Sequence, residues 1–149
     1  MSILTAHALS VALSGRPILR DVAFDLAPGQ VVGVLGPNGS GKTTLLRTIA
    51  GLLPYEGELT LAGRPVRNWP RRALARQVAW IQQRPQLGFD FTVAEFVALG
   101  RLPHRSWMGV DDATRVSALD DLLEGLDLAP LRDRPITALS GGEQQRLLL

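Results

Sequence analysis

The first third of the chain is patterned for strands. Between Ile18 and Leu26, apolar side chains stand mostly at alternate positions, which is typical of a strand with one buried face. A turn over residues 27–30 (Ala-Pro-Gly-Gln) follows. Residues 31–35, Val-Val-Gly-Val-Leu, are continuously apolar, which predicts a strand covered on both faces in a parallel sheet. A further strand is predicted over residues 58–62.

Helical signals begin after this apolar run. The sequence predicts a helix over residues 42–50, because Gly51 and Pro54 follow and would end it. A short helix over residues 69–76 comes later in the chain. It is followed by a predicted buried strand over residues 78–81, Val-Ala-Trp-Ile.

From residue 84 the pattern becomes helical. Thr92 and Glu95 have the spacing of a capping box, which predicts a helix to about Leu99. A second helix is predicted over residues 111–126, whose apolar positions recur at helical spacing. Those positions are Val116, Leu119, Leu122, Leu123 and Leu126. We therefore expect a helical insert over residues 84–138.

Length and composition indicate a globular protein. The chain has 149 residues, 46% of them apolar, and no cysteine, which excludes disulfides and thiolate metal sites. No apolar run approaches the roughly 18 residues needed to cross a bilayer. The first residues, Met1 to His7, lack the pattern of a secretion signal. These observations favour a cytoplasmic location.

The net charge of +2 is too small to indicate nucleic-acid binding, but the basic residues are unusual. Fifteen of the sixteen are arginine, and Lys42 is the only lysine. A compact ammonium group fits beside phosphate oxygens in a way that a planar guanidinium does not. The position of Lys42 therefore points to phosphate chemistry.

The segment around Lys42 fits the P-loop pattern Gly-x-x-x-x-Gly-Lys-Thr, between a predicted strand and a predicted helix. Its glycines let consecutive N–H groups turn toward an anion, and the helix directs its positive end at the same group. Lys42 would reach the β- and γ-phosphates, and the Thr43 hydroxyl would bind Mg²⁺. A glycine-rich turn without a ligand is the structural alternative. The predicted nucleotide-binding residues are Gly36, Pro37, Asn38, Gly39, Ser40, Gly41, Lys42, Thr43 and Thr44.

A second motif occupies residues 139–146, Leu-Ser-Gly-Gly-Glu-Gln-Gln-Arg. Ser140 and Glu143 have the spacing of a capping box, so the motif predicts the start of a helix. Gly141 and Gly142 keep side chains away from this helix end and leave its N–H groups open to an anion. The two interpretations are compatible, because the N-terminus of a capped helix is also the place where its N–H groups can bind an anion.

Together the two motifs resemble the ATP-binding-cassette (ABC) family, in which the second motif is the signature. The resemblance implies ATP and Mg²⁺ as ligands and a head-to-tail dimer, in which each signature contacts the γ-phosphate held by the partner's P-loop. It assigns Ser140, Gly141, Gly142, Glu143 and Gln144 to that contact. It also places the Q-loop residue, which senses Mg²⁺ and the attacking water, at Gln83, with Gln82 as the alternative.

The resemblance implies an α/β fold: a P-loop NTPase core with an antiparallel β subdomain and an inserted helical subdomain. Residues 1–83 correspond to the β-rich P-loop part, 84–138 to the helical subdomain, and 139–149 to the signature and the start of the next helix. The aspartate that orders Mg²⁺, the catalytic glutamate and the switch histidine would all lie beyond Leu149, so the C-terminal part of the core is missing. We therefore expect a piece of a longer cassette that is poorly stable alone, binds nucleotide weakly and does not hydrolyse it.

Residues 89–104 resemble a segment of ATPases that drive import of iron chelates, haem and cobalamin. This implies an importer subunit that works as a homodimer with integral membrane permease subunits, on the cytoplasmic face of the inner membrane. A periplasmic binding protein would be an indirect partner, and no nucleic acid is expected. The sequence departs from the family pattern at the position of the aromatic residue that stacks on adenine. Leu13 takes that position here, beside Val11 and Ala12.

Non-transport members of the same family are the alternative. DNA-repair ATPases place a coiled coil or a zinc insertion before the signature, whereas here 55 residues without cysteine separate Gln83 from Leu139. Ribosome-associated members usually carry two cassettes. A plain P-loop kinase is a further alternative if the second motif is only a helix cap. The arginine cluster over residues 64–76 is interpreted as a solvated face or one near anionic lipid headgroups, rather than as a nucleic-acid patch.

Overall fold

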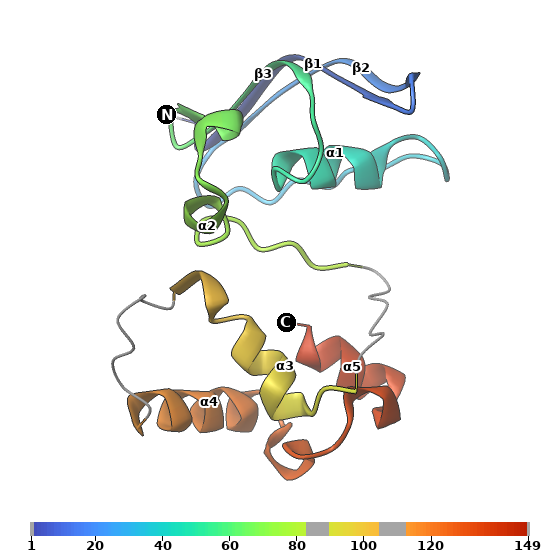
Figure 1. Cartoon of the computed structure of the whole chain (residues 1–149). Helices are drawn as coiled ribbons and strands as arrows, with labels where there is room; N and C mark the ends of the chain where they lie inside the picture. Colours follow the sequence, from blue (N-terminus) through green and yellow to red (C-terminus); the bar gives the residue numbers. More distant parts are fainter. Residues whose placement is uncertain (1, 83–89, 105–112, 149) are drawn as a thin grey trace. The chain divides into compact units, whose positions relative to one another are not determined.

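The computed structural model describes residues 2–82, 90–104 and 113–148, with the backbone alone over 113–118. The chain divides into two compact units, Met1–Trp80 and Ile81–Leu149. The first contains the sheet and the P-loop segment, and the second contains the helices that lead to the signature segment (Figure 1).

Unit 1 is built on a four-stranded antiparallel sheet. Its strands are β1 (Leu4–Leu13), β2 (Arg16–Leu26), β3 (Glu56–Leu61) and β4 (Arg64–Pro65), in the order β2-β1-β3-β4. The strands predicted over 18–26 and 58–62 are therefore confirmed. The buried core of this unit consists of Leu4, Ala6, Leu9, Leu59, Leu61, Val66 and Leu74.

The central strand β1 changes its buried face part-way along. Leu4 and Ala6 are buried at alternate positions, and then Leu9 and Val11 are buried instead of residues 8 and 10. A register shift against β2 falls between Ala6 and Leu9. Such a bulge restores the apolar side chains to the core side of the sheet.

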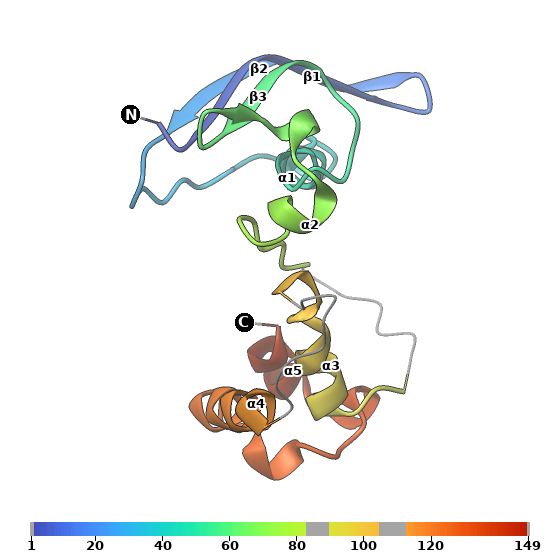
Figure 2. The same ribbon diagram turned by 60° about the vertical axis from the view of Figure 1, so that its left-hand side comes forward.

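Helix α1 (Lys42–Ile49) lies along one face of this sheet, as both views show (Figures 1 and 2). It ends in a Schellman turn, in which the N–H of Gly51 donates to the Thr48 carbonyl and the N–H of Leu52 donates to the Arg47 carbonyl, both at 2.9 Å. The sequence prediction of this helix and of its end at Gly51 is confirmed.

The strand predicted over residues 31–35 is wrong for this structure. The segment has no regular secondary structure, and Val31 and Leu35 are 98% and 93% exposed. The buried strand predicted over residues 78–81 is wrong as well, since Ile81 is 51% exposed in an irregular segment. A parallel strand needs neighbours to pair its backbone, and no strand of the described part of unit 1 pairs with either segment.

The helix predicted over residues 69–76 is shorter than expected. A 3-10 turn, η1 (Val66–Asn68), is followed by helix α2 (Arg71–Leu74). Pro70 is the N-cap of α2, and a proline there fits because it has no N–H to leave unpaired at the start of the helix.

Unit 2 is helical in the ranges that the structure describes. Its α-helices are α3 (Val93–Leu99), α4 (Ala113–Gly125) and α5 (Gly141–Leu147), joined with the 3-10 turns η2 (Leu102–His104), η3 (Ala129–Leu131) and η4 (Ile136–Ala138). The buried core consists of Val93, Leu123, Leu128, Ile136, Leu139 and Leu147. None of the helices within 2–82, 90–104 and 113–148 is both long and apolar enough to cross a membrane.

The predicted helix over residues 111–126 is confirmed as α4 for the part that is described. One of the predicted apolar positions does not face the core. Leu119, Leu123 and Leu126 contact the core, but Leu122 is 46% exposed. Leu122 lies 100° around the helix from Leu123, at the margin of the apolar stripe.

Candidate functional site

The P-loop segment is a tight, exposed turn that leads directly into α1. Gly36, Gly39 and Gly41 have positive φ angles of 152°, 81° and 91°. Residues 36–40 are all exposed, so the turn presents its backbone to solvent. The predicted binding residues Gly36 to Thr44 thus lie together in one loop and the first turn of one helix.

Gly41 is held against the sheet. A Cβ atom added there would lie 2.7 Å from Leu19 Cδ2 and 3.3 Å from Ile18 Cγ2. Both neighbours belong to β2, so the close approach of Gly41 anchors the start of α1 on that strand. A residue with any side chain would move the loop away from the sheet.

The start of α1 offers unpaired backbone donors. Gly41 is the N-cap, and no side chain accepts a hydrogen bond there. The first intrahelical bond is donated by the Leu45 N–H to the Gly41 carbonyl at 2.8 Å. The N–H groups of Lys42, Thr43 and Thr44 have no acceptor among the described residues, and the helix dipole adds positive potential at the same end. This helix end can therefore bind a phosphate group.

The Lys42 ammonium lies over the same loop. Its Nζ donates to the carbonyls of Gly36 and Pro37, both at 2.7 Å. These bonds hold the charge over the turn formed by residues 36–40, which leads into the open N–H groups at the start of α1. An anion in the loop would thus meet a charged donor and a set of backbone donors together.

The two threonines that follow Lys42 differ in their surroundings. Thr43 is exposed, so its hydroxyl is free to act as a single oxygen ligand for Mg²⁺. The carbonyl of Thr44 accepts a 2.8 Å bond from the hydroxyl of buried Thr48, which ties the first turn of α1 to the second. No group of three or more acidic or histidine side chains in the described residues could hold a metal ion alone, so phosphate oxygens and water would have to complete the coordination.

The signature segment forms the predicted capping box. The Ser140 N–H donates to Glu143 Oε2 at 2.6 Å, and the Glu143 N–H donates to Ser140 Oγ at 3.4 Å. The bond from the Ser140 backbone N–H, and next an interaction with the Ser140 side chain, lower the pKa of the Glu143 carboxyl, with smaller contributions from the charges of Arg134 and Arg146. The box therefore holds a charged carboxylate beside the start of α5.

The N-terminus of α5 differs from that of α3, which has the same type of cap at Thr92. In α3 the first two N–H groups, of Val93 and Ala94, donate to the carbonyls of Arg134 and Arg132 at 3.1 and 3.0 Å. In α5 the corresponding N–H groups of Gly141 and Gly142 have no acceptor in the described parts of the chain.

Apart from the adjoining residues and the backbone of α5 itself, no heavy atom of the described residues lies within 4 Å of a Cβ built on Gly141 or Gly142. The start of α5 is thus open to an incoming group, while the start of α3 is closed by the chain itself. Of these two helices, α5 alone retains backbone donors that an anion could reach.

Leu139 and Leu147 anchor the signature segment in the core of unit 2. Gln144, predicted to contact a partner's nucleotide, has its amide nitrogen bonded within unit 2. Its Nε2 donates to the carbonyls of Ile136 and Leu139 at 3.4 and 3.3 Å. Sequence reasoning did not anticipate this structural role, which becomes visible only once η4 folds back beside α5.

The predicted Q-loop residue Gln83 lies outside the described residues. The alternative, Gln82, is exposed in an irregular segment. The sequence has two histidines: His7 stands opposite Glu58 in the register of β1 and β3, and His104 ends the turn η2.

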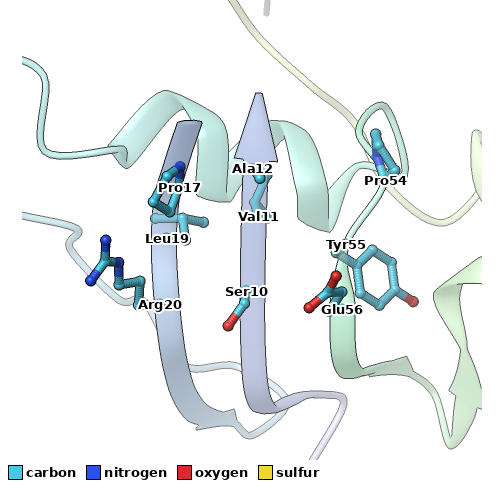
Figure 3. A pocket seen from close by; sticks show the side chains of 9 residues that line it. All are labelled: Ser10, Val11, Ala12, Pro17, Leu19, Arg20, Pro54, Tyr55 and Glu56. Carbon is cyan, nitrogen blue, oxygen red and sulfur yellow. The ribbon is translucent and has the colours of Figure 1, made fainter. Parts of the chain in front are cut away.

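An aromatic residue that the sequence analysis missed lies close to the expected base-contact strand. A pocket of about 360 Å³ is lined by Val11, Ala12, Leu19 and Tyr55, among others, at the junction of β1, β2 and the start of β3 (Figure 3). Leu13, the expected position of the base contact, is not part of this lining. Tyr55 follows the helix α1 in sequence rather than preceding the P-loop, so only the folded sheet brings it beside Val11.

Comparison with known proteins gives a consistent result. The family model for ABC transporters matches residues 19–149. The hemin import ATP-binding protein of Pseudomonas putida is 41% identical over 147 residues, 98% of this chain and 56% of that protein. The cobalamin import ATP-binding protein of Halobacterium salinarum is also 41% identical over 147 residues, which is 36% of its length. The chain thus spans about half, or less, of the curated relatives it matches.

Solved structures agree with this result. An ATP-binding cassette of an ABC transporter superposes with a TM-score of 0.79 at 28% identity, over 99% of this chain and 63% of that one. A nucleotide-free cassette gives a TM-score of 0.77 at 27% identity and is covered to 65%. The P-loop NTPase fold class and the resemblance to import ATPases are confirmed. Because the family model covers most of its length, the chain belongs to the ABC transporter family.

Proposed function

We propose that this chain supplies the ATP-binding part of an ABC importer subunit. The observation that carries the proposal is the row of open N–H groups at the start of α1, from Lys42 to Thr44, beneath the Lys42 ammonium. A strongly charged, multi-oxygen ligand such as a nucleotide triphosphate satisfies all of these donors at once. In this proposal ATP is the ligand and Mg²⁺ binds the phosphates beside the Thr43 hydroxyl.

The signature segment is proposed to act on the nucleotide of a second copy. Open N–H groups at Gly141 and Gly142 would contact the γ-phosphate that the partner's P-loop holds, while the Ser140–Glu143 box fixes the end of α5. Gln83 would sense Mg²⁺ and the attacking water. ATP-driven closure of such a dimer would then be transmitted to the membrane permease.

The proposals for the cargo and the location of the protein are based on the names of its relatives. Relatives that are 41% identical are hemin and cobalamin import ATP-binding proteins. We infer an iron chelate, haem or cobalamin as cargo, permease subunits as partners, and a position on the cytoplasmic face of the inner membrane. Recovery of an integral permease by the tagged chain from membranes would support transport, whereas recovery of ribosomes or DNA instead would support a non-transport ATPase.

Nucleotide binding is tested with Lys42→Ala. Titration calorimetry with ATP and Mg²⁺ should show binding by the unchanged chain and at least a tenfold loss in the variant, because a charge-assisted donor to phosphate contributes roughly 1.5–3 kcal/mol. Arg47→Ala removes a positive charge from the last turn of the same helix and is the control. Equal affinity of the Lys42 variant and the control would refute the proposal.

Hydrolysis is tested separately. The 149 residues contain none of the groups to which the family resemblance assigns cleavage of the γ-phosphate, so we expect binding without turnover. Phosphate release should stay at the level of the Lys42→Ala variant. Mg²⁺-dependent turnover that this substitution abolishes would contradict the expectation.

A further inference from the structure

Unit 1 carries a second pocket, of about 550 Å³, between the turn after α1, the turn η1 and helix α2. Val66 and Leu74 are buried apolar members of its lining, and Leu52 is 51% exposed. Arg67 and Arg71 line it too, together with the aromatic residues Tyr55 and Trp69. We call this site the arginine pocket. None of the P-loop residues 36–44 lines it, and it shares Tyr55 with the pocket of Figure 3.

The walls of the arginine pocket are held in place by local contacts. The Schellman turn places Gly51 so close to α2 that an added Cβ would lie 2.5 Å from Leu74 Cδ2. Trp69 Nε1 donates to the Arg64 carbonyl at 3.4 Å, and the Arg67 N–H donates to the Tyr55 hydroxyl at 3.2 Å. The apolar and aromatic parts of the lining are thus fixed before any ligand arrives.

Positive charge is concentrated around the same lining. The Arg64 guanidinium lies 5.3 Å from the ring centre of Trp69, and that of Arg67 lies 4.8 Å from the ring centre of Tyr55. Arg71 is exposed at the start of α2. Among the described residues, no carboxylate pairs with these three arginines.

The sequence around the pocket is also basic. Residues 59–82 contain five arginines and no acidic residue. The pocket therefore combines the guanidinium groups of Arg67 and Arg71, which no described carboxylate pairs with, with an apolar lining and two amphipathic aromatic side chains.

We propose that the arginine pocket binds the surface of an anionic phospholipid membrane. Guanidinium groups pair with headgroup phosphates in a planar, bidentate way, and each basic residue near such a surface adds to the attraction. Exposed Leu52 and half-buried Leu53 provide an apolar surface for the adjoining glycerol and acyl region, while Trp and Tyr side chains favour the interface between the two. This contact goes beyond the proposed nucleotide function and does not require it.

Nucleic acid is the less suitable anionic partner. Binding of single strands depends on bases that stack on aromatic faces, but one face of Trp69 and one of Tyr55 are already covered by the chain's own arginines. The Tyr55 hydroxyl is also bonded within the chain. The apolar part of the lining has no counterpart on a phosphate backbone.

The test is flotation of the full 149-residue chain with vesicles, either of phosphatidylcholine alone or mixed with phosphatidylglycerol. We expect binding to the anionic vesicles only, weakened by added salt. Arg67→Gln with Arg71→Gln should weaken partitioning about thirtyfold, the effect of two charges near the surface. Arg71→Gln alone removes a charge that has no described partner, so this substitution should leave the fold intact. Its loss of partitioning, smaller than that of the double variant, would therefore report on the contact with the vesicle.

The matched control is Arg16→Gln with Arg20→Gln, which removes the same charge from exposed positions on β2. It should keep most of the binding, and Lys42→Ala should keep vesicle binding while it loses ATP, which separates this inference from the proposed function. Equal losses in the two double variants, equal binding to neutral vesicles, or tighter binding to an oligonucleotide or an acidic peptide would each overturn the proposal.

Discussion

Gly41 meets two requirements that no other residue type satisfies together. Its φ of 91° lies in the left-handed region, and its α-carbon approaches Leu19 too closely to carry a side chain. The same position is the uncapped start of α1, where the open donors lie. The backbone geometry that admits phosphate thus depends on packing against the sheet.

Gly41→Ala should destabilise unit 1 by roughly 2–4 kcal/mol, because backbone strain and steric overlap with Leu19 add together. Gly39→Ala is the control: its φ of 81° imposes the strain, but no heavy atom lies within 4 Å of the new Cβ. It should cost only about 1 kcal/mol. Urea unfolding of both variants measures the difference, and equal losses would show that contact with β2 is unimportant.

At the scale of elements, the capping boxes are local devices whose bonds depend on ionised carboxylates. The carboxylates of Glu95 and Glu143 each accept from the backbone N–H of their own N-cap residue, Thr92 or Ser140, and the Thr92 hydroxyl also donates to Glu95. These bonds lower the pKa of both carboxyls, the backbone bond contributing most. A lowered pKa means that the folded helix start favours the charged form.

The two helix starts should therefore loosen on acidification. The stabilisation is fully present above the ordinary glutamate pKa of 4.5 and is lost as the pH falls through the lowered pKa of Glu143 in the folded chain. NMR titration should show the Ser140 amide signal moving in that window. Glu143→Gln should abolish the movement, and persistence of the shift in this variant would assign it to another group.

At the scale of the whole molecule, the same residue types have opposite surroundings in unit 1. Leu9 and Val11 are buried in β1, whereas Val31 and Leu35 are almost fully exposed. The difference does not lie in hydrophobicity. The first pair stands in a strand that is bonded on both sides, and the second stands in a segment with no described neighbour strand.

Leu9→Ala should lower the free energy of unfolding of unit 1 by about 2–5 kcal/mol, since it leaves a cavity in the core. Val31→Ala should change it by no more than about 0.5 kcal/mol, because that side chain is 98% exposed. Thermal unfolding of the 149-residue chain measures both. A large loss from Val31→Ala would mean that residues 31–35 are buried in solution.

The sequence by itself determined what depends on neighbours in the chain. The P-loop spacing, the end of α1 at Gly51 and the boxes at Thr92 and Ser140 were all predicted, because caps, turns and helix ends are set by a few adjacent residues. The family resemblance was also carried by such short segments.

Only the tertiary structure decided what depends on residues distant in sequence. A continuous apolar run becomes a buried strand only where other strands pair with it, so residues 31–35 could not be assigned from their pattern. The hydrogen bonds of the Gln144 amide and the place of Tyr55 beside β1 likewise depend on distant partners. The arginine pocket required the turn after α1 to fold against α2, because burial and hydrogen bonding across elements are properties of the assembled fold.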